Sequence, residues 1–220
     1  INVTLQTLAN GSMYIGNSLS GTGTVQNAGI MSIDFVDALK PMSGNFTNSN
    51  WVDQVKDLTR INNTTNSGGI YNIGVGATFT QNAGTFSFTG GVIRDGASAP
   101  AGKFTNSGTG IFDFNNASPT SLSITGLFTN SSTFNVKQNL TRASAFKNTT
   151  ASGIIEITPG KTFTNTGAFE MNGGFLKATT SAATNGAFIN QKTFSVTASA
   201  TNTSNFTNDF IAVPNTPAMT

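Results

Sequence analysis

The chain has 220 residues, of which only 9% are charged, and its formal net charge is +2. It contains no cysteine and no histidine, which excludes disulfides, thiolate catalysis, cysteine metal sites and every Ser-His-Asp arrangement. Its basic residues are scattered between Lys40 and Lys192, so the sequence offers no basic patch for nucleic acid. Because 37% of the residues are apolar and 18 are phenylalanine, the chain can still fill a core.

A short motif recurs along the chain: an apolar residue, a variable residue and an asparagine, followed by a polar turn. The anchoring asparagines, in chain order, are Asn10, Asn27, Asn48, Asn66, Asn82, Asn106, Asn130, Asn148, Asn165, Asn190 and Asn208. At Asn82 the phenylalanine, Phe79, is displaced by one position. Anchors lie about 20 residues apart on average, a period that is typical of repeated supersecondary units.

At seven anchors the apolar residue of the motif is phenylalanine: Phe46, Phe104, Phe128, Phe146, Phe163, Phe188 and Phe206. Two further apolar residues often follow four and six positions after the anchor, as Phe134 and Val136 follow Asn130. This alternation is typical of a strand with one buried face. We therefore expect an all-β protein, a parallel β-helix (β-solenoid) of about eleven rungs with a mean period of about 20 residues. The phenylalanines would form one core stack, and the asparagines one hydrogen-bonded ladder.

Residues 1–220 are predicted to form a single β-solenoid domain. A charged insertion or short helical excursion is expected near residues 34–60, which hold seven of the 20 charged residues and the only tryptophan, Trp51. The spacing of Val52 and Val55 is compatible with one or two helical turns. No stretch approaches 18 apolar residues, so no membrane span is expected. The chain starts at Ile1, and we interpret it as a processed or excised segment.

Catalytic, metal-binding and cofactor-binding residues are not predicted. Glycosidase chemistry needs two carboxylates that face each other, and the chain has nine acidic residues. One of the two pairs that lie close in sequence, Asp53 and Asp57, is interleaved with Lys56 and Arg60, which is typical of a solvated surface. We therefore expect no enzyme activity and no cofactor.

Residues 104–108, Phe-Thr-Asn-Ser-Gly, and residues 163–169, Phe-Thr-Asn-Thr-Gly-Ala-Phe, resemble the rungs of large secreted bacterial β-helices. The families concerned are autotransporter passenger domains and filamentous-haemagglutinin-like adhesins, and the resemblance extends over about residues 8–213. It implies secretion, an extracellular or cell-surface location, and adhesive or scaffolding work. The sequence departs from these families because it shows no secretion signal, no translocating barrel and no long uniform repeat array.

We expect a non-enzymatic extracellular structural protein that assembles end to end into a fibre, filament or sheath, since the open ends of a solenoid invite pairing with another copy. The alternative is an adhesin or glycan-binding passenger fragment, in which Tyr14, Trp51 and Tyr71 would line a groove for a cell-surface glycan. A polysaccharide-active enzyme is a minor alternative. The expected partners are further copies of the chain, without nucleic acid.

Overall fold

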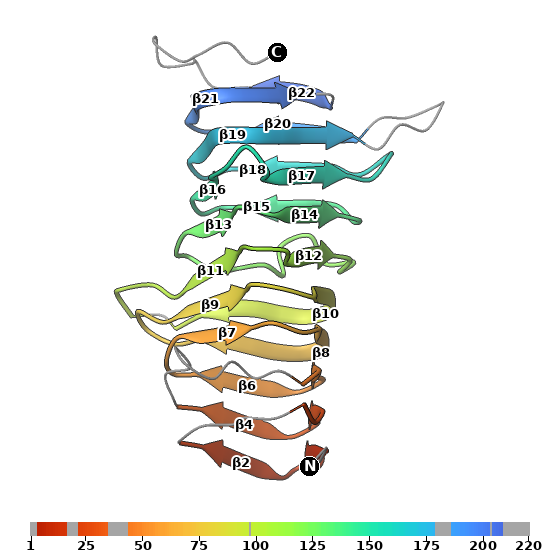
Figure 1. Cartoon of the computed structure of the whole chain (residues 1–220), viewed down its shortest axis with the longest axis vertical. Helices are drawn as coiled ribbons and strands as arrows, with labels where there is room; N and C mark the ends of the chain where they lie inside the picture. The colour runs from red at the N-terminus through yellow and green to blue at the C-terminus, as the bar shows by residue number, and fades with distance from the viewer. Residues whose placement is uncertain are drawn as a thin grey trace.

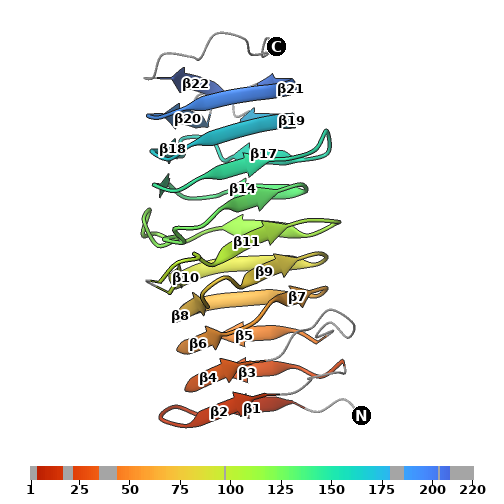
Figure 2. The ribbon, with the colours of Figure 1, turned by 90° about the vertical axis from the view of Figure 1, so that its left-hand side faces the viewer.

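The computed structural model describes residues 4–16, 22–34, 44–96, 98–178, 186–202 and 204–208, without the side chains of residues 178, 197–201 and 208. Throughout these ranges every regular element is a β-strand, and the strands pair in parallel. The chain winds into an upright β-solenoid with a period of about 21 residues, whose first face has ten strand layers (Figures 1 and 2). The predicted fold class is therefore confirmed, although the solenoid has fewer turns than the expected eleven rungs.

Most complete turns contribute three strand segments, so the rod has three faces, which we number in chain order; in the turn of β12 and β13 the second face has only an isolated bridge, between Leu122 and Ile93. The first face consists of β1 (Leu5–Thr7), β3 (Val25–Asn27), β5 (Phe46–Asn48), the starts of β8 (Thr64–Ile73) and β10 (Thr85–Asp95), β12 (Ile111–Phe114), β14 (Thr133–Val136), β17 (Ile154–Ile157), and the ends of β19 (Phe169–Ala178) and β21 (Phe194–Asn202).

The second face consists of β2 (Ser12–Ile15), β4 (Ile30–Ile33), β6 (Trp51–Gln54), the ends of β8 and β10, β15 (Leu140–Arg142), β18 (Thr162–Asn165), β20 (Ala187–Asn190) and β22 (Asn205–Asn208). The third face consists of β7 (Leu58–Arg60), β9 (Thr78–Gln81), β11 (Lys103–Asn106), β13 (Phe128–Asn130), β16 (Phe146–Asn148) and the starts of β19 and β21.

Four long strands, β8, β10, β19 and β21, continue around a corner from one face to the next.

Strict alternation of buried and half-exposed residues explains why these short segments form strands. In β5 the side chains of Phe46 and Asn48 are buried, while Thr47 between them is half-exposed. Because successive side chains of a strand point to opposite faces, each triplet sends one apolar and one amide side chain inward. The core of the rod is therefore a continuous pile of inward side chains, each placed above its counterpart one turn earlier.

The phenylalanines form separate columns, one for each face, and not a single stack. On the third face six rings lie one above another, with centroid separations of 4.8–5.4 Å: Phe79, Phe104, Phe128, Phe146, Phe169 and Phe194. Phe163, Phe188 and Phe206 follow one another on the second face, and Phe46 lies on the first. The expectation of one core stack was wrong because the motif changes face along the chain.

Glycine allows the long strands to bend where two faces meet. Gly91 in β10 has a φ of 76°, and a Cβ added to it would lie 1.9 Å from the carbonyl oxygen of Gly69 in the turn below. No larger residue fits this corner, because both the backbone angle and the close approach exclude a side chain. Gly173 and Gly174 play the same role in β19, with φ values of 97° and 87°.

The helix expected over residues 51–58 does not form, and this expectation was wrong. Trp51–Gln54 is strand β6, and Leu58–Arg60 is strand β7, so residues 44–60 belong to a regular turn of the solenoid. Its inward residues are Val52 and Gln54, a spacing of two that the polar character of Gln54 conceals. Residues 35–43, which complete the expected insertion, lie outside the described residues.

Candidate functional site

The inward asparagines form three short ladders, one on each face. Asn27, Asn48 and Asn66 lie in register on the first face, Asn106, Asn130 and Asn148 on the third, and Asn165 and Asn190 on the second, where the backbone of Asn208 continues the register. All but Asn208, whose side chain lies outside the described part, are buried. Each turn from that of Asn27 to that of Asn190 thus contributes one ladder asparagine. The asparagine column moves to another corner after Asn66 and again after Asn148.

Within a ladder each amide donates to the next asparagine and to the backbone of the corner. Asn130 illustrates the arrangement: its Nδ2 donates to Asn148 Oδ1 at 2.8 Å and to the carbonyl oxygens of Ser132 and Ile154 at 2.9 and 3.1 Å. Its Oδ1 accepts from Asn106 Nδ2 at 2.9 Å. The first-face ladder has the same geometry, with 2.8 Å between Asn27 Nδ2 and Asn48 Oδ1. These bonds give corner carbonyls a second donor: the carbonyl of Ser132, for example, also accepts from the N–H of Ile154 at 2.7 Å.

Two of the predicted anchors do not belong to any ladder. Asn10 is exposed in a turn with a φ of 65°, and Thr7 occupies the inward position below Asn27. Asn82 is also exposed, and Gln81 occupies the inward position below Asn106. Both assignments were wrong because the ladder position always lies two residues after the inward apolar residue of the strand. Any polar residue can occupy that position, and it need not be asparagine. At Phe79 that position is Gln81, which agrees with the displacement visible in the sequence.

Two buried arginines lie at ladder positions, and sequence reasoning missed both. Leu58-Thr59-Arg60 and Leu140-Thr141-Arg142 have the inward pattern of the Phe-Thr-Asn triplets, with arginine in place of asparagine. Arg60 lies directly below Gln81 on the third face, and Arg142 lies directly below Asn165 on the second. The shared Leu-Thr-Arg triplet is the sequence signal that could have identified them.

Backbone carbonyl groups surround the guanidinium of Arg142. Its Nη1 donates to the carbonyl of Ile124 at 3.3 Å, and Nη2 donates to those of Gly126 and Ala145 at 2.9 and 3.2 Å. The guanidinium carbon also lies 5.5 Å from the centre of the Phe128 ring. Burial lowers the pKa of Arg142 to about 9, which leaves the side chain charged at neutral pH. A charged group is thus held inside the rod by carbonyl dipoles and a ring face.

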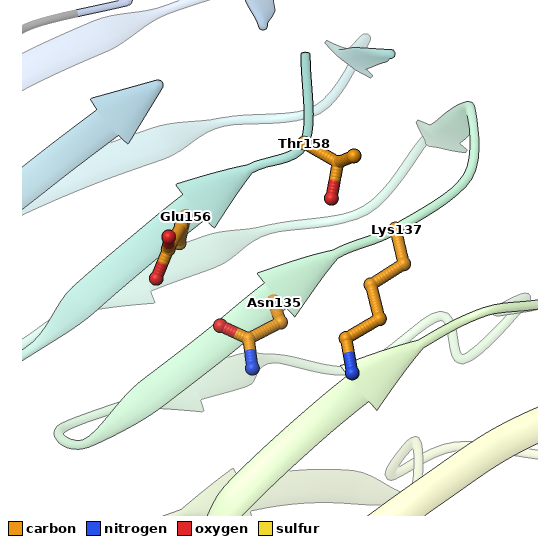
Figure 3. Close-up of a pocket in the computed structure, with 4 residues that line it drawn as sticks. All are labelled: Asn135, Lys137, Glu156 and Thr158. Carbon is orange, nitrogen blue, oxygen red and sulfur yellow. The ribbon is translucent and has the colours of Figure 1, made fainter. Parts of the chain in front are cut away.

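A polar hollow on the first face is lined by Asn135, Lys137, Glu156 and Thr158 (Figure 3). Lys137 Nζ lies 2.6 Å from Asp113 Oδ2 in the turn below, and Asn135 Nδ2 donates to Asp113 Oδ1 at 2.7 Å. Both carboxylate oxygens of Asp113 therefore have a partner. In the sheet register, Asn135 lies between Asp113 in the turn below and Glu156 in the turn above. The cluster is best explained as a polar ladder that links three turns.

The three aromatic residues considered for a glycan groove do not come together. Tyr71 is buried in the core, where its hydroxyl donates to Gln54 Oε1 at 3.1 Å, and burial raises its pKa. Tyr14 and Trp51 both lie on the second face and point outward. The guanidinium carbon of Arg94 lies 4.8 Å from the centre of the Trp51 ring, so one face of that ring is already occupied.

Trp51 belongs to a column of outward apolar residues on the second face. Ile30, Trp51, Ile70 and Val92 lie in register on four successive turns. Ile30 is 54% exposed, and the other three are half-exposed. The neighbouring outward column is polar: Ser32, Asp53, Asn72 and Arg94.

Comparison with family models, with curated proteins and with solved structures yields no match. The resemblance to secreted bacterial adhesins therefore rests on the solenoid fold and its rungs. In the described ranges, no helix is long and apolar enough to span a membrane, and no three acidic side chains gather as a metal site would require.

Proposed function

We propose that this chain is a non-enzymatic structural rod of the extracellular space or cell surface, and that it joins further copies end to end. The observation that carries the proposal is the open strand edge of the first described turn. The N–H of Leu5 donates to the carbonyl of Thr24 at 2.9 Å, so strand alternation directs the N–H and C=O of Gln6 away from β3. Among the described residues, no strand pairs with this edge of β1.

The adjacent strand presents the same kind of edge. The carbonyls of Gly11 and Ile15 accept from β4 and the residue after it, so the backbone groups of Ser12 and Tyr14 point outward. The core residues at this end are only partly covered: Leu5, Met13 and Ile15. Unpaired backbone groups beside partly exposed apolar residues favour pairing with another strand layer.

The opposite end offers a matching edge. Strand β22 pairs with β20 on one side, and within the described ranges no strand covers its other side. Phe206 in β22 is only half-buried, whereas Phe188 beneath it is fully buried. Joining the two ends would continue the parallel ladder and the core together. The extracellular location is supported by the resemblance of the rungs to secreted β-helices.

A proline at Gln6 tests the open edge without breaking a bond inside the rod. Proline removes the outward N–H of Gln6 and is tolerated on a free edge, whereas Gln6→Thr keeps the N–H and serves as the matched control. Electron microscopy and sedimentation velocity should show the unmodified chain and Gln6→Thr as rods longer than roughly 45 Å, the length of one rod at about 4.8 Å per strand layer. Gln6→Pro should shorten them. An unmodified chain that stays monomeric at high concentration would refute end-to-end assembly.

Gln6→Pro must remain folded for the comparison to count. The fluorescence of the only tryptophan, Trp51, which lies two turns above β1, reports on this directly.

A further inference from the structure

We propose that the second face pairs laterally with the second face of another copy of this chain, in an antiparallel arrangement. The pairing surface is the apolar column Ile30, Trp51, Ile70 and Val92, together with the charged residues at its two ends. This pairing does not depend on the end-to-end joining proposed above, because it uses a sheet face and no strand edge.

In the turns that carry this column, the second face differs from the other two in its outward side chains. The corresponding outward column of the first face is Gln26, Thr47, Thr65 and Ser87, and that of the third face is Thr59, Thr80, Thr105 and Thr129. Both columns are polar, as expected for a sheet face in water. Four apolar residues in register on the second face form a ridge roughly 14 Å long, and an exposed apolar patch with a polar rim marks an interaction site.

Charge complementarity identifies the occupant as a second copy. The ridge carries acid at its N-terminal end, where Asp34 follows β4 and Asp53 lies in β6, and base at the other end, where Arg94 lies in β10. In the described part of the chain neither Asp34 nor Arg94 forms an ion pair. Asp95, beside Arg94, is turned to the backbone N–H groups of Thr125 and Gly126.

A twofold axis that crosses the ridge between Trp51 and Ile70 reverses the order of the turns in the partner. Ile30 then lies opposite Val92 of the other copy, and Arg94 lies over the end that carries Asp34. Such an interface is isologous, so each favourable charge contact occurs twice. With the rods parallel instead, each turn would face its own counterpart, and Arg94 would stay away from the turn that Asp34 follows.

A glycan fits this surface less well than a second copy does. Sugar rings stack on open aromatic faces, but Arg94 occupies a face of Trp51, and branched aliphatic residues flank the ring above and below. Branched aliphatic residues suit the dry interdigitation of two sheets about 10 Å apart. The face of one chain is smaller than a standard interface, so the isolated pair should be weak and should strengthen where rods present several faces in line.

Disulfide trapping tests both the pairing and its polarity, because the chain has no cysteine of its own. We expect an equimolar mixture of Ile30→Cys and Val92→Cys chains to give a covalent dimer under mild oxidation, at least fivefold more than either variant alone. Thr105→Cys, on the third face, is the matched control and should give none. Equal trapping by Ile30→Cys alone would show parallel rods and overturn the proposal, as would the absence of trapping in the mixture.

Charge exchange provides an independent readout in sedimentation equilibrium. Arg94→Asp and Asp34→Arg should each weaken self-association about tenfold, and the double variant should recover most of the loss. Failure of the double variant to recover would overturn the antiparallel arrangement. Repeating the trapping with Gln6→Pro separates the two proposals, since blocked ends should leave lateral trapping unchanged. A chain that binds a polysaccharide through Trp51 and stays monomeric would replace the second copy by a glycan.

Discussion

Arg142 and Asn165 are register neighbours on β15 and β18, and each has a buried polar atom without a hydrogen-bond partner in the described structure: Nε of the arginine and Oδ1 of the asparagine. One is a donor and the other an acceptor. Asn106, the lowest asparagine of the third-face ladder, shows the same unpartnered Oδ1, because the amide of Gln81 beneath it donates to the carbonyls of Asn62 and Ala83 instead. An arginine below the ladder therefore places donors where the column starts.

Replacing Arg142 by leucine should lower the free energy of unfolding by about 2–4 kcal/mol. The carbonyls of Ile124 and Gly126 would each lose a donor at about 1–3 kcal/mol, whereas that of Ala145 keeps the N–H of Phe128, and relief from burying the charge offsets part of the loss. Arg142→Gln should cost less, because Gln81 holds the equivalent position under Asn106. Urea denaturation followed by tryptophan fluorescence measures both, and a leucine variant as stable as the parent would contradict this role.

Replacing Asn130 by leucine should destabilise the rod by at least about 3 kcal/mol, because the partners Asn106, Ser132, Asn148 and Ile154 would all lose a bond. The neighbouring outward change Thr129→Leu should stay within about 0.5 kcal/mol, as surface substitutions usually do.

The anchors that the structure rejects supply a further control for the ladder. Asn82 is exposed, so Asn82→Ala should cost less than about 1 kcal/mol although the sequence motif treats it like Asn130. Equal losses at Asn82 and Asn130 in urea denaturation would contradict the ladder assignment.

Replacing Phe128 by alanine should cost about 3–5 kcal/mol, as other large core truncations do. Its ring lies between Phe104 and Phe146, at centroid distances of 4.8 and 5.0 Å with interplanar angles of 7° and 8°. Phe206→Ala, at a half-buried ring near the end of the rod, is the matched comparison and should cost clearly less. A reversed order of the two losses would show that the third-face column does not carry the core.

Replacing Gly91 by alanine should destabilise the protein by more than 2 kcal/mol, because a Cβ there meets the carbonyl oxygen of Gly69 and φ is 76°. Gly68, in the adjoining turn, is the control: a Cβ there would meet only the carbonyl oxygen of Ser49, at 3.9 Å. Gly68→Ala should therefore be neutral or slightly stabilising. Thermal unfolding measures the stability of both variants, and equal losses for Gly91→Ala and Gly68→Ala would contradict the prediction.

Stability should fall as the pH rises above about 10, and Tyr71 should account for part of the fall. Burial raises the pKa of Tyr71 above its usual value of 10, so the unfolded chain loses this proton while the folded chain keeps it. Between these two pKa values the folded state binds more protons, and the free energy of unfolding declines with pH.

The variant Tyr71→Phe should be less stable than the parent at pH 7, where Gln54 Oε1 loses its donor, and should show a shallower alkaline decline. Tyr14→Phe, at an exposed phenol, is the control and should leave the buried contribution in place. Urea denaturation between pH 7 and 11 gives both slopes, and identical slopes for the parent and Tyr71→Phe would contradict the assignment.

The sequence was sufficient to predict the fold class because inward alternation is a local signal. Phe46 and Asn48, for example, flank an outward threonine in a pattern that needs no knowledge of the neighbouring turns. The number of turns was overestimated because the motif was taken to mark one corner. Between Asn66 and Asn106 it moves from the first face to the third, and this shift depends on pairing across distant turns.

Buried polar residues account for most of what the sequence could not show. Gln54 is inward because its amide reaches the carbonyls of Lys56 and Thr78 and its Oε1 accepts from Tyr71, partners up to 24 residues away. Arg60 and Arg142 are inward for the same kind of reason. Composition alone places such residues at the surface, since charged side chains are rarely buried. The column on the second face was likewise hidden, because its members are separated by 19–22 residues and become neighbours only in the sheet.

The passage of the amide ladders from corner to corner has a mechanical consequence for the rod. A column that followed one corner throughout would brace that side only and would let the rod bend more easily in other directions. Here the bracing moves around the axis in blocks of three turns, so resistance to bending is shared among the corners. The ladder changes corner above Asn66 and above Asn148, and at these two planes of the described structure no hydrogen bond joins asparagine side chains of successive turns. Pulled along its length, the rod should yield first at these planes and part into blocks, not unravel one turn at a time.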